Sequence, residues 1–267
     1  MPASTIPLIA QAEEHGSRTA IISSEGTFTY SQLLERSSQL GLSLLAGKED
    51  LKEDRIAFLT PRGFAYAALQ WGIWRAGGIA VPLGEMYPAA ELEYLIGDSG
   101  ASMVIGHPEF AAKLRSIAGD LGVPFVLTEE LHSTATATLP EINPNRRAMI
   151  LYTSGTTGKP KGVVSTHSNI QAQVTSLIEA WEWTTEDYVL HVLPLHHVHG
   201  IVNVLACALW AGAKCEILPE FGALEVWKKF VERDLTLFMA VPTVYVKLIA
   251  AWEAAAPQEQ RLMRDAC

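Results

Sequence analysis

Short apolar runs alternate with amphipathic stretches along most of the chain. Runs of about five residues, such as Arg55–Leu59, Ile79–Leu83 and Met103–Gly106, have the length expected of buried strands. Between them, apolar residues recur at helical spacing, for example over residues 63–75 and 88–99. Strands that alternate with helices in this way predict a parallel sheet with helices on both faces.

The alternation is interrupted once and then resumes. Residues 129–147 lose the periodicity and are rich in Thr, Pro and Asn. We therefore expect an α/β fold with two doubly wound, mainly parallel sheets flanked by helices. The first α/β unit would cover residues 1–140, and the second, residues 141–267, would carry a glycine-rich loop.

Two helix starts are predicted from capping residues. Thr29 stands three residues before Gln32, the spacing of a capping box, ahead of leucines at helical intervals. Ser168 is predicted to cap a helix that runs to about Trp181. Further along, the pattern predicts a helix over residues 199–210 and a strand over residues 235–241.

The glycine-rich loop lies between two apolar runs, Met149–Tyr152 and Val163–Ser165, which predicts a hairpin-like turn. Glycines let a backbone turn tightly and aim successive N–H groups inward, while hydroxyls add donors and lysines add positive charge. A loop with these residues is suited to binding a polyphosphate. The residues assigned to it are Thr153, Ser154, Gly155, Thr156, Thr157, Gly158, Lys159 and Lys161.

Two other interpretations of this loop fit the sequence less well. A Walker A loop needs the spacing G-x-x-x-x-G-K-[ST], but Gly155 and Gly158 are three apart and Pro160 follows Lys159. A surface hairpin is possible because Gly, Ser, Thr and Lys are common loop residues. The density of donors between two strands favours the phosphate site.

A second segment, residues 191–200, is rich in histidine. His196, His197 and His199 follow a predicted strand, and ligands bind at the carboxyl ends of strands in open α/β sheets. A metal site is one interpretation, but adjacent histidines usually point apart and no Cys or carboxylate is close in sequence. A packing role fits His191, within the strand. The third interpretation is a substrate site next to a carboxylate and a phosphate.

Charge and composition limit the partners. The formal net charge of −9 argues against a nucleic-acid-binding protein, although local positive charge still permits ATP binding. Three scattered cysteines favour reduced thiols over a disulfide framework. The apolar runs are too short for a membrane span, and residues 1–5 resemble neither a secretory signal nor a mitochondrial presequence. We expect a cytoplasmic protein, or a matrix protein if a presequence is missing.

Thr153–Gly162 resembles the phosphate loop of the adenylate-forming (AMP-binding) superfamily, and Pro194–Gly200 resembles its second core motif. The resemblance implies that a carboxylic acid and ATP form an acyl-adenylate, with Mg²⁺, and that coenzyme A then takes the acyl group. It implies catalytic roles for His197 and Lys161 and a metal contact for Thr157. It also implies acyl contacts for His197 and His199. A histidine at position 199 departs from the family pattern and suits a polar acyl group.

The likeness is stronger to malonyl-CoA and methylmalonyl-CoA synthetases. The segments that carry this likeness are Arg55–Leu59, Gly72–Gly78, Leu193–Gly200 and Ala240–Tyr245. Other acyl chain specificities, as in fatty acyl-CoA synthetases, stay open.

Enzymes of this family continue well beyond the position of Cys267. We therefore expect residues 1–267 to be a truncated AMP-binding N-terminal domain with the C-terminal domain absent, inactive alone. An alternative is a non-catalytic truncated isoform that acts as a binding partner. The oligomeric state is left open.

Overall fold

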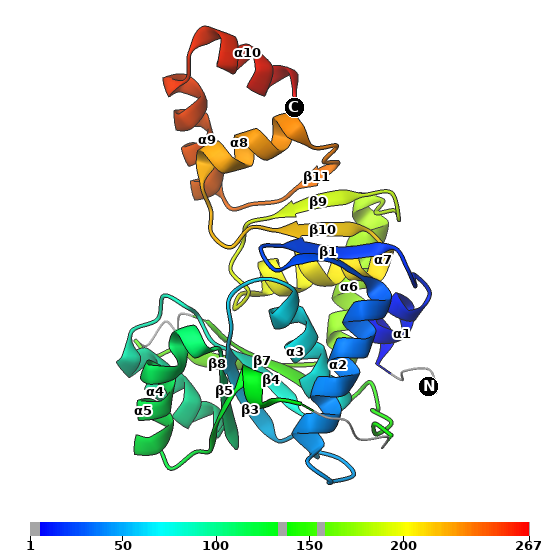
Figure 1. Cartoon of the computed structure of the whole chain (residues 1–267), viewed down its shortest axis with the longest axis vertical. Helices are drawn as coiled ribbons and strands as arrows, with labels where there is room; N and C mark the ends of the chain where they lie inside the picture. The colour runs from blue at the N-terminus through cyan, green and yellow to red at the C-terminus, as the bar shows by residue number, and fades with distance from the viewer. Residues whose placement is uncertain (1–5, 133–137, 154–157, 267) are drawn as a thin grey trace.

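The computed structural model describes residues 6–132, 138–153 and 158–266. These residues form two sheets separated by a layer of helices (Figure 1). The first sheet has the order β6-β5-β3-β4-β7-β8 and is parallel except for β8. Its strands are β3 (Arg55–Leu59), β4 (Ile79–Pro82), β5 (Met103–Gly106), β6 (Phe125–Leu127), β7 (Arg147–Thr153) and β8 (Lys161–Thr166).

The second sheet has the order β11-β9-β10-β1-β2 and is parallel except for β2. Its strands are β1 (Thr19–Ser23), β2 (Gly26–Thr29), β9 (Tyr188–His191), β10 (Lys214–Ile217) and β11 (Leu237–Phe238). The predicted fold class is thus confirmed. A boundary near residue 140 does not separate the sheets, because β1 and β2 join the later strands, whereas β7 and β8 complete the first sheet.

Helices cover the sheets in three places (Figure 1). Helices α2, α3 and α6 lie between the sheets, α4 and α5 cover the outer side of the first sheet, and α8, α9 and α10 lie beyond β11. The α-helices are α1 (Pro7–Glu13), α2 (Tyr30–Leu45), α3 (Phe64–Arg75), α4 (Ala89–Ser99), α5 (Ala111–Asp120), α6 (His167–Trp181), α7 (Cys207–Ala211), α8 (Ala223–Glu232), α9 (Pro242–Ala254) and α10 (Pro257–Asp265). Two 3₁₀ turns, η1 (Pro108–Phe110) and η2 (Thr128–Glu130), and a π-helix, η3 (His199–Ala206), complete the set.

The largest core cluster joins both sheets through the middle helices. It contains Ile21 of β1 and Ile56 of β3, with Trp71 and Trp74 of α3 fully buried between them. The Trp74 indole nitrogen also donates to the Ala148 carbonyl at 2.7 Å, so α3 is tied to β7 by a hydrogen bond as well as by packing. Both tryptophans therefore belong to the core.

The crossing of α2 and α3 requires glycine on both helices. A Cβ atom on Gly72 would lie 2.8 Å from the Leu40 Cβ, and one on Gly41 would lie 3.1 Å from the Gly72 carbonyl oxygen. At the first distance the surrounding atoms must shift, and the second is tighter than most Cβ contacts in proteins. The two glycines therefore allow the close approach that holds the middle layer together.

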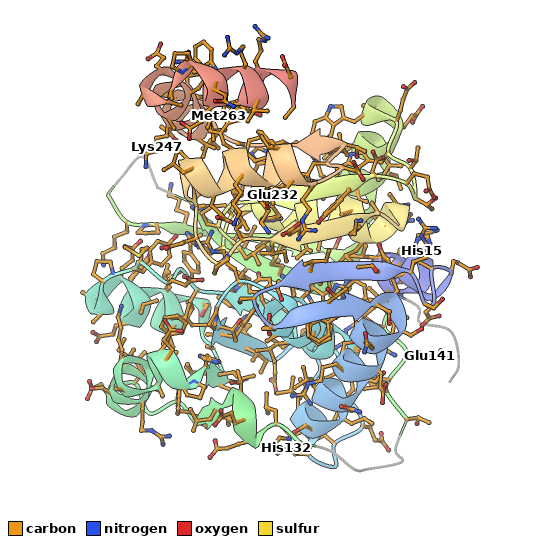
Figure 2. All side chains as sticks on the ribbon, turned by 45° about the horizontal axis from the view of Figure 1, so that its top comes forward. His15, His132, Glu141, Glu232, Lys247 and Met263 are labelled. Atoms are coloured by element: carbon orange, nitrogen blue, oxygen red, sulfur yellow. The ribbon has the colours of Figure 1, made fainter. Side chains whose placement is uncertain are left out.

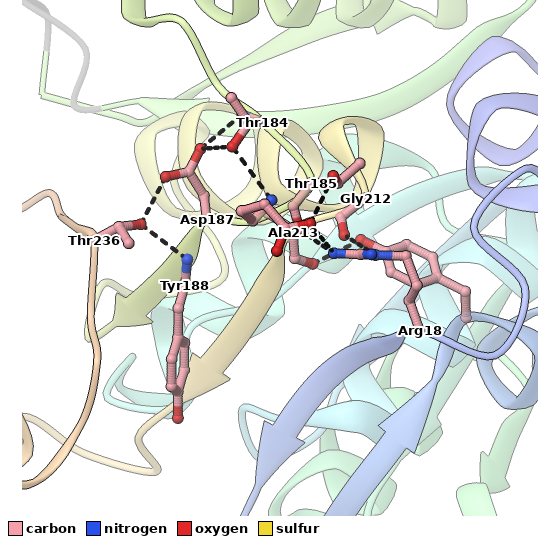
Figure 3. Close-up of polar contacts among 10 residues, drawn as sticks. Arg18, Thr184, Thr185, Asp187, Tyr188, Gly212, Ala213 and Thr236 are labelled. Carbon is pink, nitrogen blue, oxygen red and sulfur yellow. Dashed lines mark hydrogen bonds and ion pairs between the residues drawn. The ribbon is translucent and has the colours of Figure 1, made fainter.

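A polar network ties the start of β9 to its neighbours (Figure 3). The Asp187 carboxylate accepts hydrogen bonds from the Thr184 N–H and the Thr236 hydroxyl, both at 2.6 Å, and the Tyr188 N–H donates to the Thr236 hydroxyl at 2.9 Å. On the other side, Arg18 donates to the Gly212 carbonyl at 3.3 Å. These bonds fix the end of β9 opposite to the histidine segment.

Local capping was predicted partly correctly. The capping box at Thr29 is confirmed, since the Gln32 N–H donates to the Thr29 hydroxyl at 3.2 Å and the Thr29 N–H donates back to the Gln32 side chain at 2.8 Å. The prediction for Ser168 was wrong. Thr166 caps α6 instead, because Asn169 is placed to close a reciprocal pair with it.

Three other elements differ from their predicted form. The strand expected over residues 235–241 shortens to Leu237–Phe238, and the helix expected over 199–210 begins as a π-helix. Helix α10 was not predicted. It lies across α8, where Met263 and Glu232 border one shallow pocket (Figure 2), and Gln260 exchanges hydrogen bonds at 3.0 Å with Trp252 of α9.

We expect Gly72→Ala to destabilise the protein by roughly 1–3 kcal/mol, because the new methyl group overpacks the α2–α3 crossing. The matched control is Gly97→Ala on α4, where the nearest atom to the new Cβ would be 3.8 Å away. That change should stabilise by roughly 0.5–1 kcal/mol through helix propensity. Urea unfolding measures both, and equal effects of the two substitutions would contradict the proposed crossing.

Candidate active site

The glycine-rich loop and the histidine segment meet at one cavity of about 540 Å³. Thr153 ends β7, Gly158 lies at the far end of the loop, and His197 follows β9, so both sheets contribute. The two segments, far apart in sequence, thus lie side by side in the fold. The residues lining the cavity are Tyr87, Glu91, Tyr152, Thr153, Gly158, Pro160 and His197.

The central part of the predicted loop, Ser154, Gly155, Thr156 and Thr157, lies outside the described residues. Its ends are held by the antiparallel pairing of β7 and β8, whose last pair is Thr153 with Lys161. Gly158 has φ +95°, a left-handed conformation that favours glycine. The loop therefore leaves and re-enters the sheet at one point beside the cavity.

The two lysines of the loop are exposed and do not line the cavity. The Lys159 ammonium lies 5.2 Å from the centre of the Tyr94 ring, in a cation–π contact. Lys161 is the first residue of β8. Both side chains are long enough to reorient toward an anion, but neither faces one of the described carboxylates within ion-pair distance.

The histidine segment is shaped by a tight turn from Pro194 to Gly200. A Cβ on Gly200 would lie 2.4 Å from the Pro194 carbonyl oxygen, so only glycine fits there. Buried His191, at the end of β9, donates through Nε2 to the Gly200 carbonyl at 2.9 Å. The chain then enters the π-helix η3, a rare element that is frequent at functional sites.

This turn places two imidazoles side by side. The ring centres of His196 and His197 are 4.2 Å apart, and His196 makes an edge contact with Tyr87 at 4.9 Å. The expectation that adjacent histidines point apart was wrong here, because the turn is too tight to separate them. His199 is half-buried at the start of η3 and does not line the main cavity.

A smaller cavity of about 70 Å³ is lined by His196, the neighbour in sequence of His197. Arg62 and Glu85 line it, with an Nε–Oε1 distance of 3.7 Å, and Arg62 donates to the Val192 carbonyl at 3.3 Å. Burial raises the pKa of Glu85. The Arg62 guanidinium, paired with Glu85, therefore lies close enough to His196 to disfavour protonation of its imidazole.

The imidazoles are neutral in this environment. Burial, with help from His197 and Arg62, lowers the pKa of His196 to about 4, and burial also lowers the pKa of His197. A neutral imidazole can donate one N–H and accept at the other nitrogen. Within the described ranges no group of three His, Cys, Asp or Glu residues is arranged to hold a metal ion.

Sequence patterns did not single out Tyr87, Glu91 and Tyr152, which complete the cavity. Tyr87 and Glu91 follow β4, and Tyr152 is the residue before Thr153. Their position near the carboxyl ends of strands was the available signal.

The sequence profile of the AMP-binding enzyme family matches residues 8–264. The chain belongs to the AMP-binding enzyme family. The two segments that resemble this family in sequence, the glycine-rich loop and the histidine segment, both line the shared cavity. No helix among residues 6–132, 138–153 and 158–266 is long and apolar enough to cross a membrane.

Relatives and solved structures agree with this assignment. The chain is 43% identical to the human mitochondrial malonate–CoA ligase ACSF3, over 98% of its own length and 48% of that protein. It is 35% identical to a malonate–CoA ligase of Arabidopsis thaliana, over 92% and 46%. The crystal structure of ATP-bound MatB from Rhodopseudomonas palustris superposes with a TM-score of 0.82 at 26% identity, covering 95% of this chain and 52% of MatB. The chain thus spans about half the length of the curated relatives it matches.

We expect the protein to lose stability as the pH falls from about 6.5 toward 4. Burial lowers the pKa of His167 and His191 to about 4, from the ordinary value of 6.5. Below pH 6.5 the unfolded chain therefore binds more protons than the folded chain. The contribution of these neutral imidazoles to the free energy of unfolding is fully present above about pH 6.5. It declines on acidification, by up to roughly 3 kcal/mol for each fully buried imidazole.

Urea unfolding between about pH 7.5 and 4.5 measures this loss. His167→Phe is the matched variant, because His167 makes an edge contact with Trp74 that a phenyl ring preserves. The variant should lose less stability on acidification than the parent chain. A free energy of unfolding that does not change over this range would contradict the expectation.

Proposed function

We propose that this chain is the nucleotide- and acid-binding half of an ATP-dependent acid–thiol ligase that activates malonate or methylmalonate. The observation that carries the proposal is the shared cavity, where His197 and the ends of the glycine-rich loop face the same space. The human and Arabidopsis relatives are malonate–CoA ligases, which supports a small dicarboxylic acid.

The proposed reaction has two steps. A carboxylate oxygen attacks the α-phosphorus of ATP, an O–P bond forms, and the bond to pyrophosphate breaks. The thiolate of coenzyme A then attacks the acyl carbon, and AMP leaves. In the first step negative charge grows on the phosphates, which preorganised donors stabilise.

We assign these donors to the loop. Thr153, Gly158, Lys159 and Lys161 would contact the β- and γ-phosphates together with Ser154–Thr157. His197, neutral at physiological pH, would donate a hydrogen bond to the acid and orient it toward the nucleotide. An acyl contact by His199 stays a prediction.

Mg²⁺ would arrive with the nucleotide and neutralise phosphate charge. The oxygen atoms of Thr153 and Glu91, which line the cavity, are of the ligand type that Mg²⁺ prefers. Thr157, the metal contact named from the sequence, lies outside the described residues. The compartment, cytosol or mitochondrial matrix, also stays a prediction.

The chain is expected to bind Mg-ATP, and Lys161→Ala should weaken this binding about tenfold, because charged hydrogen bonds to phosphate are lost. His197→Ala should leave ATP affinity within about twofold and weaken malonate binding instead. Isothermal titration measures both, with Thr175→Val as a control, since Thr175 bonds only to carbonyls of its own helix α6. Absence of nucleotide binding would contradict the proposal for this chain.

Thioester synthesis is tested on a chimera that continues the chain with the C-terminal half of the human relative. Malonyl-CoA should form, and His197→Ala should reduce its rate. A chimera that folds and binds ATP but accepts only unrelated acids, such as long-chain fatty acids, would overturn the substrate class alone.

One observation favours a second candidate, a non-catalytic binding partner. The edge strand β8 exposes Val163 and Val164 to 50% and 48%, and exposed apolar edges invite pairing with another chain. In that case the chain would co-elute with the full-length human relative in size-exclusion chromatography. Val164→Lys should abolish the complex, whereas separate elution of the two unmodified proteins would exclude it.

A further inference from the structure

We propose that Tyr94 and Asp98 of α4 are positioning residues that hold the exit of the glycine-rich loop, residues 158–161, in the geometry that receives a nucleoside triphosphate. The part of this proposal that concerns nucleotide rests on the proposed function. The part that concerns the loop exit rests on the contacts alone.

Tyr94 touches two consecutive residues of the loop exit. Its hydroxyl lies 3.1 Å from the Pro160 carbonyl oxygen, to which it donates. The face of its ring lies 5.2 Å below the Lys159 ammonium. The Tyr94 side chain therefore holds both the Pro160 carbonyl and the ammonium group of the preceding residue, Lys159.

Asp98 extends this contact to the strand that enters the loop. Its Oδ2 atom accepts a hydrogen bond from the Tyr152 hydroxyl at 2.8 Å, and its Oδ1 atom lies 3.2 Å from the Tyr94 hydroxyl. Tyr152 immediately precedes Thr153 at the end of β7. The carboxylate thus links the entry and the exit of the loop through one helix.

Tyr94 has one hydroxyl proton and two acceptors, the Pro160 carbonyl and the Asp98 carboxylate. The second donor, Tyr152, satisfies Asp98 when Tyr94 turns to Pro160. Both tyrosines have a raised pKa, from burial and from the Asp98 charge, so both stay protonated donors at neutral pH. The trio is therefore able to keep the loop exit bonded without leaving the carboxylate unpaired.

The helix provides a firm base for these contacts. Leu92, Leu95 and Ile96 of α4 are buried in the outer core of the first sheet. Glu91, Tyr94 and Asp98, at spacings of three and four residues, share the neighbouring side of the helix, where Tyr94 packs against this core and Glu91 lines the main cavity. One helix face thus serves both the cavity and the loop.

Tyr152 also needs the residue opposite to it. Gly162 pairs with Tyr152 across the β7–β8 ladder, and a Cβ there would lie 3.0 Å from the Ile150 Cγ2 and 3.3 Å from the Tyr152 Cζ. A glycine at this place leaves the ring free to reach Asp98. The glycine that ends the sequence motif therefore has a structural reason apart from loop freedom.

The first experiment measures amide hydrogen exchange of the chain without ligand. Tyr94→Phe and Asp98→Asn should speed exchange at residues 158, 159, 161 and 162 by roughly three- to tenfold, because one hydrogen bond is lost. Tyr245→Phe is the matched control, since its hydroxyl reaches only the Phe238 carbonyl, at 3.5 Å, on another part of the fold. Unchanged exchange in both α4 variants would overturn the proposal.

The second experiment compares ATP and AMP as probes by isothermal titration. Tyr94→Phe should weaken ATP binding by roughly three- to tenfold and leave AMP binding unchanged, since the loop exit meets only the phosphate tail. Equal weakening of both would indicate a general structural role and overturn the positioning role. If the unmodified chain binds neither nucleotide, the proposed function fails for this chain, and hydrogen exchange still decides the role of Tyr94 and Asp98.

Discussion

The close crossing of α2 and α3 is the constraint on which the site depends. Gly41 and Gly72 let these helices approach, and the resulting layer packs against both sheets in one continuous core. Because both sheets rest on the same helices, the segments that follow β4 and β7 in one sheet face the segment that follows β9 in the other. The cavity is therefore a consequence of core packing, and its two chemical halves come from different sheets.

The electrostatics of the cavity complement this geometry. A chain of net charge −9 repels anions on average, so an anionic substrate needs local donors. The structure supplies neutral imidazoles, kept neutral by burial, and exposed lysines on the loop. The carboxylate proposed to bind beside His197 would favour the protonated imidazole and raise its pKa, so acid binding and proton uptake would be coupled.

Local patterns in the sequence predicted what local forces decide. Strands such as Arg55–Leu59 and the Thr29 capping box depend on neighbours within a few residues, and both were found as expected. The assignment of β1 and β2 to the second sheet, and the bond from Asp98 to Tyr152, 54 positions along the chain, depend on tertiary packing. Hydrophobic periodicity does not carry that information. The cavity's histidine was predicted because it lies in a distinctive segment of sequence, whereas its tyrosines lie in no such segment and were missed.

A loop that receives a polyphosphate has to admit its ligand and still present donors in a fixed place. The β7–β8 ladder meets the second demand up to the pair of Thr153 and Lys161, where it ends. Beyond that pair, backbone bonding within the hairpin no longer holds the described residues 158–160, and Gly158 adds conformational freedom. A contact from outside the hairpin is then the remaining means of fixing the exit, and α4 provides it through a hydroxyl and an aromatic face. Since α4 is itself anchored in the core of the first sheet, the position of Lys159 follows from packing of the fold, and order in the loop exit does not require the ligand to supply it.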